Sequence, residues 1–238
     1  MIDAWKFLGH GPLLRLEPNL WAVEGPHPRL TINRWMVVAR LADGRLIMHN
    51  PVALDGASML AIEQFGTLTW VVIPNRFHGL DAVAFKQRYP RALVVSPEAS
   101  AVHLRKQKKT IDSFLTEVPA DDTVSLEPLD GVKGGEAVMR VTSPGGHVTL
   151  AFGDALFNMP HGSGFVMFML RLIGSTGGPR VTRLMQLAGV SDKKALAAHL
   201  RRLSATPGLV RLIPGHGQLI DRDAPATLAA VADRLAPE

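Results

Sequence analysis

The chain has 238 residues, of which 47% are hydrophobic and 20% charged, a balance typical of globular proteins that excludes an intrinsically disordered chain. It contains no cysteine, so disulfide frameworks and thiolate metal sites are excluded, and any metal must be held by histidine or carboxylate side chains. The formal net charge of +5 permits attraction to anionic ligands but does not identify one.

Neither the N-terminal residues nor the later apolar stretches have the pattern of a targeting or spanning segment. Residues 1–18 lack the charged start and long apolar run of a signal peptide. The most apolar stretch, residues 164–174, is interrupted by Arg171 and is shorter than the roughly 20 residues that a spanning helix needs. We therefore expect a soluble, cytoplasmic protein without a membrane partner, and the absence of cysteine is compatible with a reducing compartment.

The first half of the chain begins with short β-like runs and continues with strand–helix units. Strands are predicted over 13–16, 19–23, 35–41, 45–49, 68–73 and 92–95, and helices over 57–64, 81–89 and from Pro97 onward. The turn Ala42-Asp43-Gly44 indicates a β-hairpin. The run 35–41 shows no clean alternation, which is typical of a strand covered on both faces.

A second β-rich segment starts near residue 123 and is again followed by helices. Strands are predicted over 123–126, 136–142, 147–152 and 209–213, and helices over 165–172, 180–187, 192–203 and 224–235. Two β-rich segments, each followed by helices, predict an α/β fold, a four-layer αββα sandwich of two related halves. We expect residues 1–238 to form a single domain.

Three polar motifs each follow an apolar strand. They are I-P-N-R-F-H-G at residues 73–79, F-G-D at residues 152–154 and P-G-H-G at residues 214–217. Loops at strand ends commonly carry function, and glycine allows the sharp turn that brings a side chain over the sheet edge. His78, Asp154 and His216 are therefore candidate ligands for one divalent metal, Zn²⁺, Mn²⁺ or Fe²⁺, with a position left for water or substrate.

The order of these motifs, over residues 20–220, resembles the metallo-β-lactamase fold family. In that family a buried strand ends in H-x-H-x-D-H, a later strand ends in Gly-Asp, and a last strand ends in Pro-Gly-His-Gly. Residues 152–157, F-G-D-A-L-F, and 213–217, I-P-G-H-G, are similar to the second and third elements. The resemblance implies an αββα sandwich with a metal-dependent hydrolytic site where His78, Asp154 and His216 converge.

The first motif departs from the family pattern at three positions. Aligned on His78, it has Ile73 and Asn75 at the two earlier histidine positions and Phe77 at the aspartate position. Isoleucine cannot ligate a metal, and an amide oxygen is a weak ligand for zinc. The resemblance thus implies a degenerate, mononuclear site without the three-histidine metal, in which Asp154 is both a ligand and the candidate catalytic residue.

Other histidines are weaker candidates. The third family histidine follows a Pro-Gly, and here Pro144-Gly145-Gly146-His147 is one residue longer, so His147 is a further candidate metal ligand, with a non-ligand role as the alternative. His161 lies just beyond a Met-Pro pair and is a candidate for the cleft. His49 is expected to make structural hydrogen bonds.

Two other runs have alternative interpretations. The basic run 103–109 lacks interleaved aromatic residues, so it indicates a solvated helix face and makes a nucleic-acid partner unlikely. The apolar run 165–170 is too continuous for an exposed helix and predicts core packing, with a homodimer surface or an apolar wall of the substrate cleft as alternatives.

The sequence therefore supports three hypotheses of function. The first is a metal-dependent hydrolase of the metallo-β-lactamase fold, acting on an unidentified small molecule. The second is a non-catalytic member of the fold that uses the cleft to bind a ligand or protein, suggested by Ile73, Asn75 and Phe77. The third, a nucleic-acid hydrolase or binder, rests on net charge alone.

Overall fold

A computed structural model describes residues 5–237, apart from the side chains of residues 165 and 166. The first sheet has seven strands in chain order, β1 Leu14–Glu17, β2 Leu20–Pro26, β3 Asn33–Arg40, β4 Arg45–His49, β5 Thr67–Val72, β6 Leu93–Ser96 and β7 Ser113–Phe114. The second has the order β13-β10-β9-β8, with β8 Val124–Pro128, β9 Ala137–Thr142, β10 Val148–Ala151 and β13 Leu209–Ile213. A small third sheet joins β12 Gly178–Arg180, β11 Phe157–Met159 and β14 His216–Gly217.

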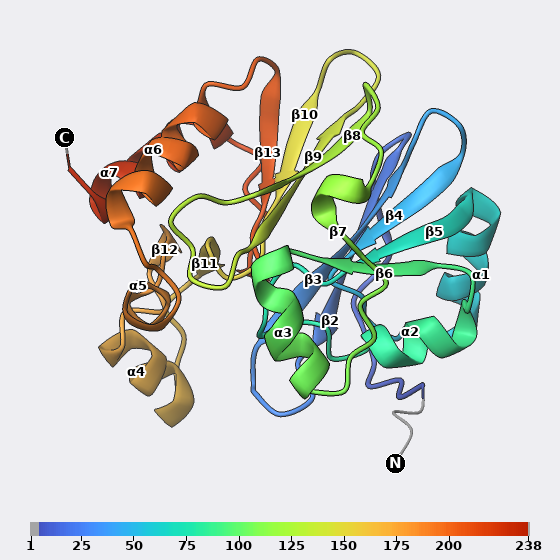
Figure 1. Cartoon of the computed structure of the whole chain (residues 1–238). Coiled ribbons are helices and arrows are strands. Elements are labelled where there is room, and N and C mark those ends of the chain that lie inside the picture. The colour runs from blue at the N-terminus through green and yellow to red at the C-terminus, as the bar shows by residue number, and fades with distance from the viewer. Residues whose placement is uncertain (1–4, 238) are drawn as a thin grey trace.

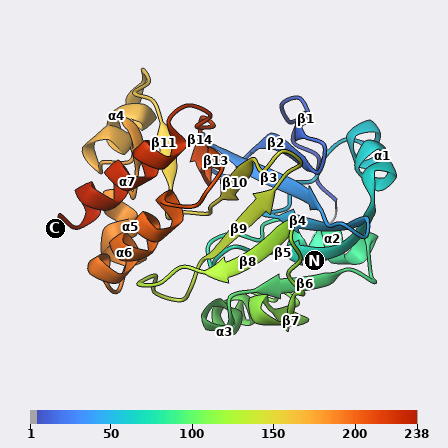
Figure 2. The same cartoon turned by 90° about the horizontal axis from the view of Figure 1, so that it is seen from above.

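Helices cover the outer face of each large sheet (Figure 1; Figure 2 gives the view from above). On the first sheet they are α1 Gly56–Phe65, α2 Ala82–Arg88 and α3 Glu98–Lys106. On the second sheet they are α5 Arg183–Ala188, α6 Lys193–Ser204 and α7 Ala224–Leu235, whereas α4 Phe165–Leu172 lies apart from that sheet (Figure 1). A 3₁₀ turn at Leu115–Glu117 precedes β8. None of the helices within residues 5–237 combines the length and hydrophobicity that a membrane crossing requires.

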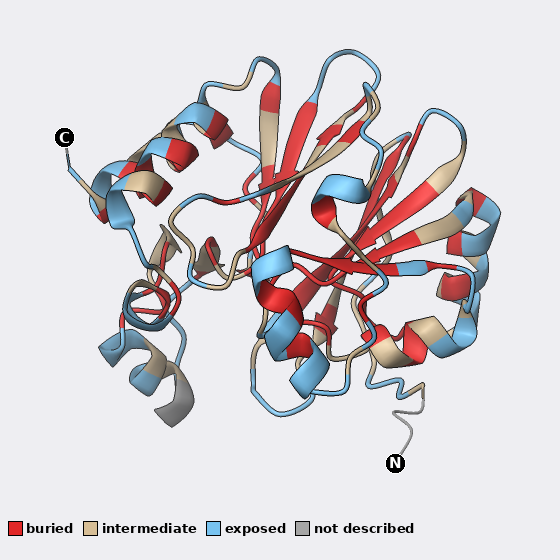
Figure 3. Ribbon diagram, viewed as in Figure 1, coloured by how far each residue is buried: buried red, intermediate tan, exposed pale blue. Residues whose placement is uncertain are grey.

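Three separate hydrophobic clusters fill the spaces between the layers. One joins the first sheet to α1–α3 and includes Met36, Met59 and Phe85. The second joins the inner faces of the two sheets and includes Val37 and Met139, and the third joins the second sheet to α5–α7. Three interlayer cores define four layers, so the predicted αββα sandwich is confirmed, and Figure 3 shows the buried residues concentrated in the sheets.

Strand β3 illustrates why a buried strand need not alternate in sequence. Met36 and Val38 contribute to the outer core against the helices, whereas Val37 and Ala39 contribute to the core between the sheets. Successive side chains still point to opposite faces, but both faces are apolar because both are covered. The hairpin predicted after β3 is also present, since β3 pairs antiparallel with β4 and Gly44 adopts a φ of +85°.

Two helix starts differ from prediction for identifiable reasons. The helix predicted from residue 180 begins at Arg183, because the Thr182 side chain accepts a hydrogen bond from the Met185 N–H (3.1 Å) and residues 178–180 form β12. The helix predicted from Asp81 begins at Ala82, and the Asp81 carboxylate pairs with Arg34 instead of capping the helix. The first change combines a local cap with the pairing of β12 to β11, and the second depends on a tertiary partner. The basic run 103–109 does lie at the solvent-exposed end of α3, with Leu104 buried.

Candidate metal centre

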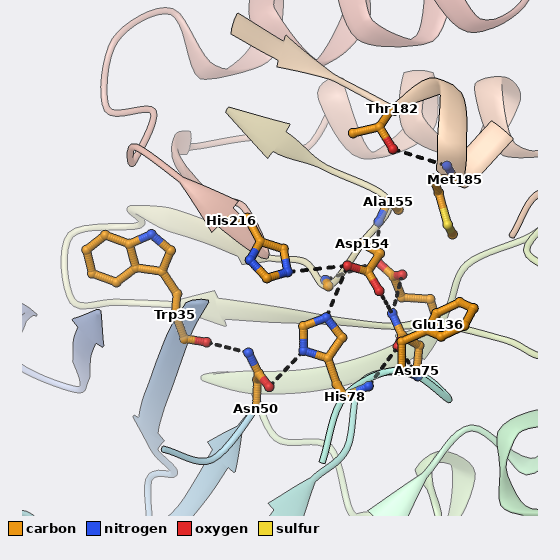
Figure 4. A network of polar contacts seen from close by, with 12 residues as sticks. Trp35, Asn50, Asn75, His78, Glu136, Asp154, Ala155, Thr182, Met185 and His216 are labelled. Atoms are coloured by element: carbon orange, nitrogen blue, oxygen red, sulfur yellow. Dashed lines mark hydrogen bonds and ion pairs between the residues drawn. The ribbon is translucent and has the colours of Figure 1, made fainter. Parts of the chain in front are cut away.

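The ends of three strands bring His78, Asp154 and His216 together (Figure 4). His78 follows β5 of the first sheet, Asp154 follows β10 of the second, and His216 begins β14 immediately after β13. One potential ligand atom from each side chain lies within 4.8 Å of the others. The parallel pairing of β10 with β13 places their carboxyl ends at the same edge, where His78 approaches from the facing sheet.

Both imidazoles direct the same nitrogen at the same carboxylate oxygen. The Oδ1 atom of Asp154 lies 3.2 Å from Nε2 of His78 and 3.5 Å from Nε2 of His216. The two rings are 5.6 Å apart between centroids, and all three residues are largely buried. Two imidazole nitrogens and one carboxylate oxygen thus converge on a single point.

Hydrogen bonds to the other ring nitrogens determine which atoms are free to bind a cation. His216 donates from Nδ1 to the carbonyl oxygen of Asn33 (2.6 Å). His78 donates from Nδ1 to Oδ1 of Asn50 (2.9 Å), and Asn50 is oriented by its own amide N–H, which donates to the carbonyl of Trp35 (2.8 Å). Because carbonyl oxygens only accept, each Nδ1 must carry the hydrogen. Nε2 is then the ring nitrogen of each histidine that faces the site and that would bind a cation through its lone pair, the arrangement expected of metal-binding histidines.

Asn75 holds the second oxygen of Asp154. Its amide nitrogen donates to Asp154 Oδ2 (3.0 Å) and to Glu136 Oε2 (2.9 Å). Its amide oxygen accepts hydrogen bonds from the backbone N–H groups of Phe77 (2.9 Å) and His78 (3.3 Å). Asn75 therefore connects the loop that carries His78 to Asp154, a positioning role in place of metal ligation.

Glu136 is a functional candidate that sequence reasoning missed. Its side chain is fully buried, and Oε1 accepts hydrogen bonds from the N–H groups of Gly153 (3.0 Å) and Ala155 (2.9 Å), which flank Asp154. It thereby supports the backbone on both sides of Asp154. The signal available in the sequence was a single carboxylate between Gly135 and the apolar start of β9.

The two neighbouring carboxyl groups have opposite protonation preferences. Burial, together with the charge of Asp154, raises the pKa of Glu136 to about 8. Burial alone would raise the pKa of Asp154 as well, but the imidazoles of His78 and His216 outweigh burial and hold that pKa well below its ordinary value. At neutral pH, Glu136 is thus a neutral acid and Asp154 carries the negative charge of the site.

His147 does not reach this group, contrary to the expectation that it is a fourth ligand. Its side chain is 54% exposed, and its Nδ1 lies 3.4 Å from a carboxylate oxygen of Glu17. His147 precedes the four residues of β10, whereas Asp154 follows them, so about 13 Å of strand separates the two ends at about 3.3 Å per residue. The alternative, a non-ligand position, agrees with this geometry.

The other two histidines considered from sequence also lie outside the group. His161 is exposed, and its Nδ1 is 3.0 Å from the Thr176 hydroxyl. His49 is buried with Nε2 3.4 Å from the Ala137 carbonyl, and burial lowers its pKa to about 4. His49 is accordingly neutral and part of the packing beside the site, as predicted.

A cleft of about 360 Å³ opens beside the three residues. It is lined by His27, Leu30, Ile32, Arg34, Phe77, His78, Leu80, Asp154, Phe157, Leu170, Ile173, Ser175, Thr182, Leu184, Met185, Ala188, Gly189 and His216. Figure 4 shows Thr182 and Met185, at the start of α5, on the same side of the site as Asp154. The group is therefore accessible from a pocket of small-molecule size.

The apolar run 165–170 forms a helix as predicted, but its described part does not pack in the core. Phe168 is 55% exposed and Met169 is 42% exposed, while Leu170 lines the cleft. The side chains of Phe165 and Val166 lie outside the described residues. Core packing is thus wrong for the described part of this run, and the alternative of an apolar cleft wall fits Leu170.

His27 is a second cleft residue that sequence reasoning missed. It lies between β2 and β3, and its Nδ1 accepts hydrogen bonds from the N–H groups of Arg29 (3.1 Å) and Leu30 (3.0 Å). Burial and then the charge of Arg34 lower the pKa of His27, so the ring is neutral and carries its hydrogen on Nε2. Its only sequence signal was a histidine between two prolines in a loop.

Comparisons with known proteins agree with this architecture. No family model matches the sequence, and no curated protein matches it. Among solved structures, the DIM-1 metallo-β-lactamase exposed to ceftazidime is similar with a TM-score of 0.63 and 14% identity, over 97% of this chain and 100% of that one. TMB-1 has a TM-score of 0.61 and 12% identity, over 95% of this chain and 98% of that one.

A third similar structure is the metallo-β-lactamase FIM-1 from Pseudomonas aeruginosa in its mono-zinc form. Its TM-score is 0.59 and its identity 13%, over 96% of this chain and 97% of that one. Agreement over nearly the full length of each chain establishes that this protein has the metallo-β-lactamase fold. The structural likeness shows the fold, and the His78–Asp154–His216 group is a set of side chains that could hold a metal ion.

Proposed function

We propose that this protein is a metal-dependent hydrolase with one divalent metal held by His78, Asp154 and His216. The observation that carries the proposal is the convergence of two Nε2 atoms and a buried carboxylate oxygen, with both Nδ1 atoms already hydrogen-bonded to oxygen acceptors. This donor set suits Zn²⁺, Mn²⁺ or Fe²⁺, and three protein ligands leave a coordination position open.

Zinc is the metal we expect first. The mono-zinc form of FIM-1 shows that a protein of this fold can be obtained with a single zinc ion. A bound divalent metal would supply Lewis-acid polarisation of a substrate and would lower the pKa of a water molecule towards neutrality. A strong protein base is therefore not needed, which is compatible with the absence of a carboxylate at Phe77.

The residues of the chain have distinct parts in this proposal. Asp154 is the catalytic residue, because Oδ1 lies between the two histidines and would orient the reacting water. Asn75 keeps the carboxylate plane fixed through Oδ2, and Glu136 supports the backbone around Asp154. Without a metal, burial and the charge of Asp154 raise the pKa of Glu136 to about 8, so Asp154 is the charged carboxylate of the pair.

Metal titration tests the proposal directly. The protein is purified without a nickel column, stripped with a chelator and titrated with Zn²⁺, Mn²⁺ and Fe²⁺ by calorimetry and melting temperature. We expect about one equivalent of metal to bind wild type and to raise its melting temperature, whereas His216→Ala loses both effects. Wild type that binds none of the three metals, with no change in melting temperature, contradicts the proposal.

The alternative is a protein that uses the cleft for binding without catalysis. It is favoured by Phe77, which is 51% exposed at the cleft and offers no proton-transferring group. A screen of esters, thioesters, lactones and phosphodiesters separates the two functions. Turnover that is abolished by Asp154→Ala supports the hydrolase, whereas metal binding without any turnover supports the alternative.

A further inference from the structure

We propose that the substrate of this site carries an uncharged apolar chain, which lies in the cleft between the loop after β2 and the helices α4 and α5. The inference rests on the proposed hydrolase function and adds to it the class of substrate. The reacting end is a carboxylic ester, thioester or lactone, and the apolar chain is its acyl part.

The cleft walls are apolar on both sides of the metal centre. Leu30 and Phe77 form the side near the β2–β3 loop and the β5 loop, and Ile173 and Leu184 form the helical side. These four side chains are between 40% and 59% exposed although they are large and apolar. Single exposed apolar residues are common, but several gathered around one concave site indicate a ligand groove.

The charges in the cleft argue against a strongly anionic ligand along these walls. Among the described lining residues there is no lysine, and Arg34 is the single arginine. Arg34 is 2% exposed, forms an ion pair with Asp81 and donates to the Pro51 carbonyl (2.7 Å). Its Nε is shielded from solvent and has no hydrogen-bond partner, and its two terminal nitrogens are already held by Asp81 and Pro51.

Apart from Arg34, the polar residues that line the cleft are the metal centre, His27, Ser175 and Thr182. His78, Asp154 and His216 form the metal centre, the neutral His27 adds an imidazole N–H, and the Thr182 hydroxyl already accepts from the Met185 N–H. A ligand that matches this distribution has one polar, reacting end and one apolar arm. A volume of about 360 Å³ is at the lower end of small-molecule pockets, so a single short acyl chain is the occupant we assign, and not a second protein chain.

Binding of unreactive amides tests the apolar arm independently of catalysis. Butanamide, hexanamide and octanamide are titrated into the zinc-loaded full-length protein by calorimetry. We expect affinity to rise by about threefold for each added methylene, because each one leaves water on binding. Equal affinity for all three amides overturns the inference.

Two leucines on α5 provide a matched pair of variants. Leu184 is 59% exposed and lines the cleft, whereas Leu187 is 85% exposed and does not. Leu184→Gln is expected to weaken octanamide binding by about tenfold and to leave butanamide binding within twofold, whereas Leu187→Gln changes neither. An equal effect of both substitutions, or of neither, contradicts the assigned position of the chain.

An ester series separates failure of this inference from failure of the proposed function. For p-nitrophenyl acetate, butyrate, hexanoate and octanoate, we expect kcat/KM to increase with chain length in wild type and less steeply in Leu184→Gln. Hydrolysis without any chain-length dependence leaves the hydrolase proposal intact and overturns the inference. Chain-length-dependent amide binding without hydrolysis of any ester supports the apolar arm and contradicts the hydrolase.

Self-association is the competing use of the same surface. Light scattering of wild type, Leu184→Gln and Leu187→Gln is therefore measured over a range of concentrations. We expect the same oligomeric state in all three. A wild-type dimer that both substitutions dissociate, with no competition from octanamide, overturns the inference, since the leucines then contact another copy of the chain.

Discussion

The two ends of β10 both place a histidine near a carboxylate, in very different surroundings. Beyond its C-terminal end, Asp154 is buried between His78 and His216, whose second ring nitrogens are held by oxygen acceptors. At its N-terminal end, His147 is half-exposed and lies beside Glu17. A histidine thus lies near a carboxylate at both ends. The candidate metal site differs because its residues are buried and the second ring nitrogen of each histidine is held by a hydrogen bond.

Among the substitutions that test this comparison, Asp154→Ala is expected to lower zinc affinity the most. It removes the oxygen that both Nε2 atoms face, so zinc affinity should fall by more than about 100-fold. Loss of a residue that only hydrogen-bonds to a metal ligand already lowers metal affinity by about 10–100-fold. Calorimetric zinc titration of the stripped protein measures the loss. Retention of wild-type affinity would place the metal elsewhere.

Asn50→Gly tests whether the hydrogen bond between Asn50 and Nδ1 of His78 contributes to zinc affinity. Asn50 adopts a φ of 55°, which glycine accepts without strain, so the substitution removes the amide that orients His78 and leaves the backbone conformation accessible. We expect zinc affinity to fall by about 10–100-fold with a folded protein, as judged by circular dichroism. A change in zinc affinity of less than twofold would show that the tautomer and orientation of His78 do not depend on Asn50.

Glu136→Gln tests the neutral carboxyl beside Asp154. Between its ordinary pKa of 4.5 and its folded value of about 8, Glu136 keeps its proton in the folded state and loses it in the unfolded chain. The folded state then binds more protons, so stability falls as pH rises through this window, by at most about 1.4 kcal/mol per pH unit. Above about pH 8 this contribution no longer changes with pH.

The measurement for Glu136 is the urea midpoint of metal-free protein between pH 4.5 and 8.5. Wild type should lose stability with rising pH more steeply than Glu136→Gln. The variant should also be less stable overall, because the new amide N–H₂ faces the amide of Asn75. Parallel pH profiles for the two proteins would show that Glu136 does not titrate in this window.

His147→Ala is expected to have the smallest effect. Zinc affinity should stay within twofold, and the free energy of unfolding should change by less than about 1 kcal/mol, because exposed ion pairs contribute little. The same two titrations measure both quantities. A tenfold loss of zinc affinity would return His147 to the ligand set.

The local sequence was enough to predict several helices and strands and to identify the motifs around Asp154 and His216. The helices at 165–172 and 224–235 and the strands at 45–49 and 209–213 have the bounds predicted, because periodicity, proline and glycine act over a few residues. The strings around Asp154 and His216 likewise identified the strand ends where these residues converge with His78. The resemblance built on them pointed to the fold that the structure has.

Only the tertiary structure decided what surrounds the site. The sequence indicates that Asn75 is a weak metal ligand, but its role as a link between Asp154 and Glu136 depends on two loops meeting across the sheets. The position of His147 depends on which end of β10 faces the site, and the apolar cleft on how α4 and α5 pack. Chain periodicity contains no information on such contacts, because they join residues that are distant in sequence and are set by the packing of whole layers.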